Sequence, residues 1–190
     1  MAALSLNAPR STCAIARGRE AAIAAPDIAV WLGTLAWEAE SACAYSRRMQ
    51  ISPHIVVRGA DQAAAFYGAA FGAEELARIP TPDGRLMSVQ LRLGESVLHV
   101  ADEFPEMGVL GPNSIGGTGV VLSLDVADAE TSFARALAAG AEASQPLQEM
   151  FWGDLHGQLD DPFGHRWNIS QHLRDVPHEE IVAAAARVFG

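Results

Sequence analysis

The chain repeats one pattern of predicted secondary structure, and this repeat restricts its possible folds more than any other feature. Similar short stretches recur in the two halves at spacings of 67 and 68 residues: Ala60-Asp61 and Ala127-Asp128, Phe66 and Phe133, and GAEE (72–75) and GAEA (140–143). Self-similarity at a fixed period indicates that one structural unit occurs twice.

Each half is interpreted as a strand, a helix that ends at glycine, and three further strands. Alternating apolar and polar residues predict strands, and a glycine after an apolar-periodic segment predicts the end of a helix. The predicted strands are 51–57, 73–80, 85–93 and 96–102 in the first half, and 119–125, 141–150, 151–161 and 165–172 in the second. The predicted helices are 59–72, 126–140 and a last one at 178–189.

The predicted fold class is therefore α+β, with two βαβββ modules at about residues 51–102 and 119–172. One helix covers only one face of a four-stranded sheet, so the other face must be buried against something or must line a cavity. The segment EFPEMGVLGPNSIGGT (103–118) is rich in glycine and proline and is interpreted as the linker between the modules.

Composition and charge bound the possible partners. The chain is 49% hydrophobic, which predicts a packed core, and it carries a net charge of −10 with no lysine. Neither nucleic acid nor an anionic membrane is an expected partner, because both require a basic surface. The two cysteines, Cys13 and Cys43, have no zinc-site spacing, and this suits a reducing cytoplasm. The motifs of serine hydrolases, P-loops and dinucleotide-binding sites are absent.

The N-terminal segment differs from the rest of the chain. Residues 1–48 carry a charge of +1, whereas residues 49–190 carry −11. We predict that residues 1–48 are an extension outside the fold, that 49–175 form the domain, and that 176–190 form a C-terminal helix. A signal peptide is the open alternative for the N-terminal segment, although Pro26 and Asp27 interrupt its apolar part.

Three features together resemble the vicinal oxygen chelate superfamily, which includes glyoxalase I, bleomycin-resistance proteins and extradiol dioxygenases. They are the paired βαβββ units, FYGAAFGAEEL (66–76) and DPFGHRWNIS (161–170). More narrowly, ADEFPEM (101–107) and FWGDLHGQLDDPFGHRW (151–167) resemble the PhnB-like branch. The resemblance implies two curved sheets that form an open cup with the site inside it, and a homodimer. Asp161, Pro162 and Gly164 are expected to be turn residues.

The metalloenzymes of this superfamily hold a divalent ion with His and Glu side chains from four strands. The corresponding positions here fall on Ser52 or His54, on His99, on Gly119 and on Asn168, where the metalloenzymes carry Glu. Glycine has no side chain and asparagine is a poor transition-metal ligand, so the set is incomplete. His54 and His99 remain as candidate metal ligands. The sequence does not place His172 or Glu149, either of which could complete such a site.

The candidate ligand-binding residues are polar, aromatic or flexible side chains expected to face the cup: His54, Met87, His99, Trp152, Asp154 and Asn168. Trp152 and Asp154 are predicted on one strand, where an aromatic ring and a carboxylate could bind a ligand. For His54, His99 and Trp152, a purely structural role in the cup is the competing interpretation. His156 and His178 are expected to be solvated, and His165 to be structural.

Three hypotheses about function follow. The first is a protein that binds a small organic molecule in the cup without turnover, as the incomplete metal set favours. The second is a divalent-metal-dependent lyase, isomerase or dioxygenase, as His54 and His99 favour. The third is an interaction protein whose cup face forms a dimer interface and whose terminal helix contacts a partner. Neither the ligand nor a cofactor other than a divalent metal ion can be named from these residues.

Overall fold

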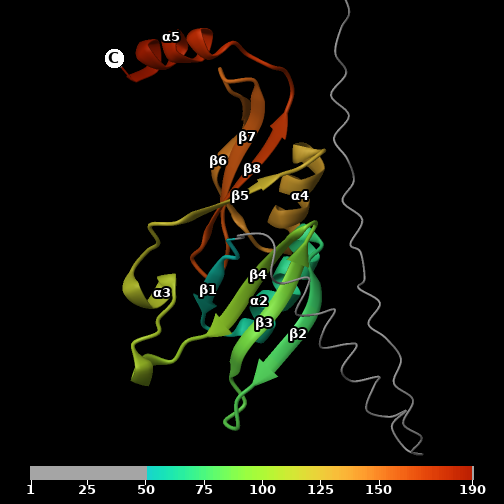
Figure 1. Cartoon of the computed structure of the whole chain (residues 1–190), viewed down its shortest axis with the longest axis vertical. Coiled ribbons are helices and arrows are strands. Elements are labelled where there is room, and N and C mark those ends of the chain that lie inside the picture. The colour runs from blue at the N-terminus through green and yellow to red at the C-terminus, as the bar shows by residue number, and fades with distance from the viewer. Residues whose placement is uncertain (1–50, 190) are drawn as a thin grey trace, which may run out of the picture. The chain divides into compact units, whose positions relative to one another are not determined.

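The computed structural model describes residues 51–189, and these form two sheets with their helices (Figure 1). The predicted extension at residues 1–48 lies outside the described residues. The elements of the first half are β1 (His54–Val57), α2 (Ala60–Phe71), β2 (Glu74–Pro80), β3 (Leu86–Leu93) and β4 (Ser96–Asp102). Those that follow are η1 (Pro105–Met107), α3 (Pro112–Ile115), β5 (Val121–Asp125), α4 (Ala129–Ala139), β6 (Glu142–Glu149), β7 (Asp154–Asp160), β8 (Arg166–His172) and α5 (His178–Phe189).

The two sheets have the same topology. The first has the strand order β1-β4-β3-β2 and the second has β5-β8-β7-β6. In each sheet the first and fourth strands of the module pair in parallel, and the remaining neighbours are antiparallel. The predicted α+β fold of two βαβββ modules is confirmed, and both sheets are open. None of the helices of residues 51–189 is both long and apolar enough to cross a membrane.

The two module helices begin at different kinds of cap. At α4, the side chain of Asp128 accepts a hydrogen bond from the backbone N–H of Thr131 at 2.9 Å. At α2 the preceding residue is Gly59, and the carboxylate of Asp102 on β4 accepts from the N–H groups of Gly59 and Ala60, at 3.0 and 2.7 Å. A carboxylate at a helix N-terminus also stabilises the helix dipole. Asp102 thereby ties the start of α2 to the sheet.

Each helix buries one face of its own sheet. Under α2 the buried positions alternate along the strands, as the period of two requires, and include Val57, Val89, Leu91 and Val100. The helices α2 and α4 also contact each other, and the guanidinium of Arg135 on α4 donates to the carbonyl of Ala70 on α2 at 2.6 Å. The two modules therefore share one core, at the helix-covered side of both sheets.

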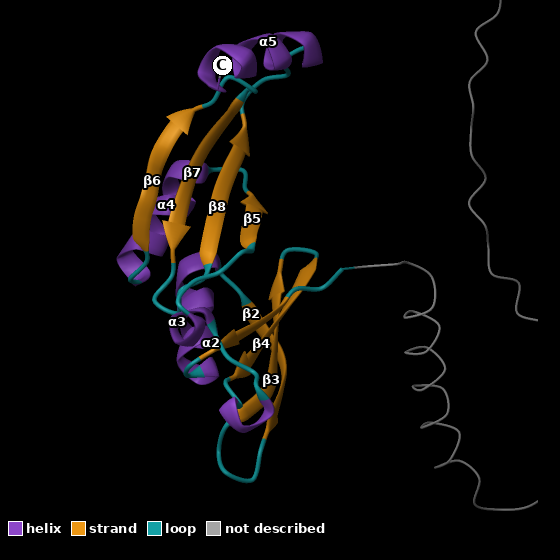
Figure 2. Cartoon of the chain, turned by 90° about the vertical axis from the view of Figure 1, so that its left-hand side faces the viewer, coloured by secondary structure: helices purple, strands orange, loops and turns teal. Residues whose placement is uncertain are grey.

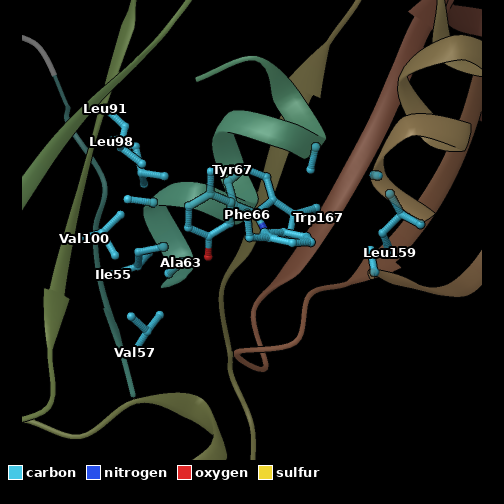
Figure 3. Close-up of a cluster of buried hydrophobic side chains, with 14 of the residues drawn as sticks. Ile55, Val57, Ala63, Phe66, Tyr67, Leu91, Leu98, Val100, Leu159 and Trp167 are labelled. Atoms are coloured by element: carbon cyan, nitrogen blue, oxygen red, sulfur yellow. The ribbon is translucent and has the colours of Figure 1, made fainter. Parts of the chain in front are cut away.

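A buried carboxylate joins the modules at the centre of this core. Asp161, in the turn between β7 and β8, accepts hydrogen bonds from the Tyr67 hydroxyl of α2 at 2.7 Å and from the Trp167 indole at 2.9 Å. Figure 3 shows Phe66 and Tyr67 of α2 beside Trp167 of β8, and the Tyr67 and Trp167 rings lie 5.3 Å apart. Burial, followed by the charge of Asp161, raises the pKa of Tyr67 well above its usual value. We call Asp161, Tyr67 and Trp167 the Asp161 clasp.

The same turn is held against β1 by backbone groups. The other oxygen of Asp161 accepts from the N–H groups of Phe163 and His165, both at 2.9 Å. The Nε2 atom of the buried His165 lies 3.1 Å from the Val56 carbonyl, which requires the tautomer with the proton on Nε2. Gly164 has a positive φ of 88°. The turn residues thus have the structural roles expected of them, and Asp161 also links the two modules.

Three predicted strands begin too early, and each error moves a candidate residue. The first strand begins at His54, so Ser52 precedes it. The seventh strand begins at Asp154, because residues 151–153 form a tight turn in which Gly153 has a φ of 100°. A β-carbon at Gly153 would lie 2.1 Å from the carbonyl oxygen of Arg174, so this turn needs glycine. The fifth strand begins at Val121, because Thr118 and Val120 bond each other locally. Trp152 consequently lies in a turn, and Gly119 precedes its strand.

Candidate functional site

The faces of the two sheets that the helices leave uncovered carry most of the polar strand residues. Cross-strand partners lie on the same face of a sheet, so the pairing registers assign the side chains. On the first sheet, His54 pairs with His99 and His99 with Gln90. On the second sheet, Ser123 pairs with Asn168 and Asn168 with Gln158. Figure 2 shows the second sheet from this free face, with α4 on its far side.

The two histidines of the first sheet are stacked on each other. Their ring centroids are 5.8 Å apart and the ring planes differ by 15°. Partial burial, and after it the charge of His99, lowers the pKa of His54 below its usual value of 6.5. His54 is therefore mainly neutral at pH 7. A neutral imidazole can accept a hydrogen bond from a ligand or bind a metal ion.

A row of hydrogen-bonded side chains crosses all four strands of the second sheet. The amide nitrogen of Gln158 donates to the side-chain oxygen of Asn168 at 3.0 Å, and the amide nitrogen of Asn168 donates to the hydroxyl of Ser123 at 3.3 Å. At the other end, the hydroxyl of Ser144 donates to Gln158 at 3.5 Å. We call Ser123, Ser144, Gln158 and Asn168 the amide ladder. Because each amide orients the next, the ladder presents fixed donors and acceptors on an open surface.

A second group of polar residues surrounds Asp154 at the far end of the same sheet. One carboxylate oxygen of Asp154 accepts from the Trp152 indole at 3.1 Å and from the Ser170 hydroxyl at 3.3 Å. The other oxygen lies 3.0 Å from Nδ1 of His172, whose Nε2 lies 3.1 Å from Asp175. We call Trp152, Asp154, Ser170 and His172 the Asp154 cluster. The hydrogen bond that the His172 ring donates to the Asp154 carboxylate is the main reason that the pKa of His172 is raised above 6.5.

Trp152 and Asp154 are thus neighbours, as the sequence analysis expected, although Trp152 lies in the turn before the strand. The indole ring is half-buried and meets the half-buried His156 edge-on at 5.9 Å. His156 was expected to be solvated, but its side chain is only partly exposed and contacts Trp152. Met87 lies at an irregularity in the pairing of β2 with β3, next to the buried Leu86, and half of its side chain is exposed.

The repeat relates the two paired sites. Ser123 and Asn168 each lie 69 positions after His54 and His99, and the register is the same in both modules. The fifth-strand position of the metal set is therefore Ser123, and not Gly119. Two imidazoles, a hydroxyl and an amide are a poor set of ligands for a divalent transition metal. Among residues 51–189, no three His, Cys, Asp or Glu side chains gather so that they could hold a metal ion.

His172 and Glu149, the residues that could have completed a metal site with His54 and His99, both belong to the second sheet. His172 bonds Asp154 there and takes no part in the histidine pair of the first sheet. Gln158, Ser123 and Ser170 were not among the predicted site residues. Alternation along β7 and β8 was the available signal, because Ser170 lies two residues from Asn168 and so shares its face.

Cavities open where β1 and β5 approach each other. The larger has a volume of about 560 Å³ and is lined by His54 and His165 together with apolar residues that include Leu110, Ile115 and Leu122. A second cavity, of about 330 Å³, is lined by residues that include Val97 and Trp167. Volumes of roughly 300–1,000 Å³ are usual for small-molecule sites. His54 therefore connects the free face of the first sheet with an apolar cavity between the modules.

The family model described as the Glyoxalase/Bleomycin resistance protein/Dioxygenase superfamily matches residues 50–169. The chain belongs to this superfamily. An uncharacterised protein of Mycobacterium bovis is 43% identical over 137 residues, which cover 70% of this chain and 90% of that protein. The structure of TioX from Micromonospora sp. ML1 has a TM-score of 0.54 and 26% identity, and it covers 66% of this chain and 100% of that one. TnmS3, an antibiotic binding protein from Streptomyces sp. CB03234, is similar in fold, with a TM-score of 0.51, 20% identity, and coverage of 67% of this chain and 99% of that one.

Proposed function

We propose that this member of the superfamily binds a small organic molecule on the free faces of its sheets, without a complete metal centre. The observation that supports this most is the amide ladder. In the second module the ladder residues Ser123 and Asn168 stand at the positions that correspond to His54 and His99. An ordered set of neutral donors and acceptors suits the recognition of a polar ligand better than the activation of water or oxygen.

The Asp154 cluster indicates the chemistry of one part of the ligand. A half-buried indole lies directly beside a carboxylate that is 25% exposed. A protonated amine can pair with the carboxylate of Asp154 while an adjoining ring or cation packs on Trp152. We therefore propose a ligand with a cationic group and an apolar or aromatic part. TnmS3 is described as an antibiotic binding protein, which agrees with a binding role. At 20% identity, however, the similarity of this chain to TnmS3 shows only a common fold.

We further propose that two copies of the chain complete the cup. If the free faces of both sheets enclosed one cup within a chain, the helices would lie on its opposite outer sides, yet α2 and α4 touch. A homodimer could place the first sheet of one copy against the second sheet of the other. Exposed apolar residues near the junction of β1 and β5, namely Ile51, Ile115 and Val120, would then gain cover. Membership of the PhnB-like branch and a cytoplasmic location are part of the same proposal.

The alternative function is a divalent-metal-dependent lyase, isomerase or dioxygenase, which the stacked His54 and His99 favour. One experiment separates the two. The purified chain is first exposed to zinc, nickel, manganese and iron(II), and its metal content is measured. Its melting temperature is then measured with a panel of cationic aromatic compounds that includes bleomycin. Binding without metal predicts a ligand-dependent rise in melting temperature that EDTA leaves unchanged.

The opposite result would be about one metal ion per chain, lost in His54→Ala and His99→Ala and retained in the control His178→Ala. His178 is a suitable control because it is exposed on α5, away from both sheets. That result, together with ligand binding that EDTA abolishes, would replace the binding proposal with the metalloenzyme.

The affinity for a cationic ligand is expected to rise as the pH increases from about 6 to about 8. Below the raised pKa of His172 its imidazolium pairs with Asp154 and competes with the ligand; above that pKa the carboxylate becomes available. The dissociation constant of a hit from the panel is measured across this range by the quenching of tryptophan fluorescence. His172→Gln should remove the pH dependence. An equally steep dependence in that variant would show that another group controls binding.

A further inference from the structure

The C-terminal helix α5 is separate from the packed part of the fold. It follows β8 after a short connection and stands beyond the end of the second sheet (Figure 1). Within residues 51–189, no other helix or strand packs against α5. Helices of about 12 residues are only marginally stable in water without a packing partner. A partner that covers its apolar side would therefore stabilise α5.

One side of α5 is apolar. Ile181, Ala184, Ala185 and Val188 follow the spacing of three and four residues that forms a single stripe on a helix. Val182 borders this stripe. The side chains of Val182 and Val188 are 54% and 61% exposed. The opposite side carries the charged residues, so α5 has the pattern of a helix with one buried face. Ile181, Ala184 and Ala185 are only partly buried, and no helix or strand of residues 51–189 covers them.

The charges of α5 are arranged by sign along its length. Glu179 and Glu180 lie in the first turn and Arg187 lies in the last. Glu180 and Arg187 are seven residues apart, which is two helical turns, so they lie along the same edge of the apolar stripe. The point midway between them coincides with the middle of the helix.

We infer that α5 pairs in antiparallel orientation with α5 of a second copy of this chain. A two-fold axis through the middle of the helix brings Glu180 of each copy beside Arg187 of the other and places the two apolar stripes face to face. In a parallel pair the edge that carries Glu180 and Arg187 would lie on opposite sides of the interface in the two copies, so these charges would not pair. Ala184 lies at the crossing point, where a small side chain allows two helices to approach to about 8 Å.

The charges favour a protein partner of this kind over a membrane surface. Helices that lie on anionic membranes carry several Lys or Arg residues on their polar face, whereas α5 has two glutamates and one arginine there. The paired surface is small: a helix of 12 residues is about 18 Å long and buries less than the roughly 1,200 Å² of a stable interface. The pairing is therefore reversible and depends on concentration unless another surface also joins the copies.

Cross-linking through cysteine tests this pairing. Ala184→Cys is made in the full chain with Cys13 and Cys43 replaced by serine, and the chains are treated with a short bis-maleimide. The matched control is Ala183→Cys, which lies beside it in the same helix but is exposed on the polar side. The pairing predicts that the 184 variant forms linked dimers roughly tenfold faster, because pairing raises the local thiol concentration. Equal rates for the two variants, with circular dichroism showing α5 intact, would overturn the inference.

Charge reversal then tests the orientation. In the Ala184→Cys background, Glu180→Arg or Arg187→Glu alone should slow cross-linking severalfold, because each places like charges opposite one another. The double exchange Glu180→Arg with Arg187→Glu should restore the original rate. Unchanged rates in the single variants, or no recovery in the double variant, would exclude antiparallel pairing. None of these substitutions touches the sheet faces, so ligand binding is tested independently.

Discussion

Replacing Asp161 with alanine is expected to lower the free energy of unfolding by about 3–4 kcal/mol, because it leaves several buried donors without an acceptor. The carboxylate is only 6% exposed and accepts from Tyr67 and Trp167 and from the backbone N–H groups of Phe163 and His165. The substitution removes the hydrogen bonds that join the two modules and also those that hold the turn between β7 and β8. Urea denaturation of the full chain measures the change.

The neighbouring Asp160 provides the control for this substitution. Asp160 pairs with Arg166 at 2.7 Å, but the two side chains are 37% and 44% exposed. Exposed ion pairs contribute little to stability because water and salt screen them, so Asp160→Ala should have a small effect. The loss of stability in Asp161→Asn should lie between those of Asp160→Ala and Asp161→Ala. The asparagine side chain keeps one acceptor oxygen, but its NH2 group replaces the other oxygen and cannot accept the hydrogen bond from the Trp167 indole. If Asp160→Ala and Asp161→Ala lowered the free energy of unfolding by similar amounts, the Asp161 clasp would not be a main source of stability.

Replacing Asp154 with alanine is expected to weaken the binding of a cationic ligand by roughly tenfold or more, as the loss of one partner of a charged pair does elsewhere. Asp154 is the least exposed acidic residue next to Trp152, and three side chains orient its two oxygens. Isothermal titration with a hit from the panel measures the affinity. The melting temperature should change much less, because the groups that bond Asp154 can reach water.

Asp175 is a matched control for the binding experiment. It has the same charge and contacts the same histidine, His172, but its side chain is fully exposed. Asp175→Ala should therefore change the affinity by less than about threefold, since an exposed charge is screened by water and salt. A comparable loss in both variants would mean that the net charge of this region matters and that Asp154 makes no direct contact with the ligand.

Local patterns were sufficient for the elements, but not for every boundary. All eight strands and both module helices were predicted. A period of two marks β3, where one face is buried, whereas β2 and β6 are almost wholly exposed and were recognised by their place in the repeat. The short helices η1 and α3 were missed inside the linker, where no periodicity exists. The turn at 151–153 was not predicted because the need for glycine there arises from a contact with a distant segment. Gly153 lies against the carbonyl of Arg174, in the chain that follows β8.

The sequence by itself determined the repeat, the fold class, the superfamily and the polar character of Trp152, Asp154 and Asn168. Only the tertiary structure decided which residues meet. Asp161 and Tyr67 are 94 positions apart, and the stacking of His54 on His99 depends on the parallel register of β1 and β4. The physical reason is that alternation assigns a residue to a face of its own strand. The partner on the next strand is chosen by register and by helix packing, which involve residues far away in the chain.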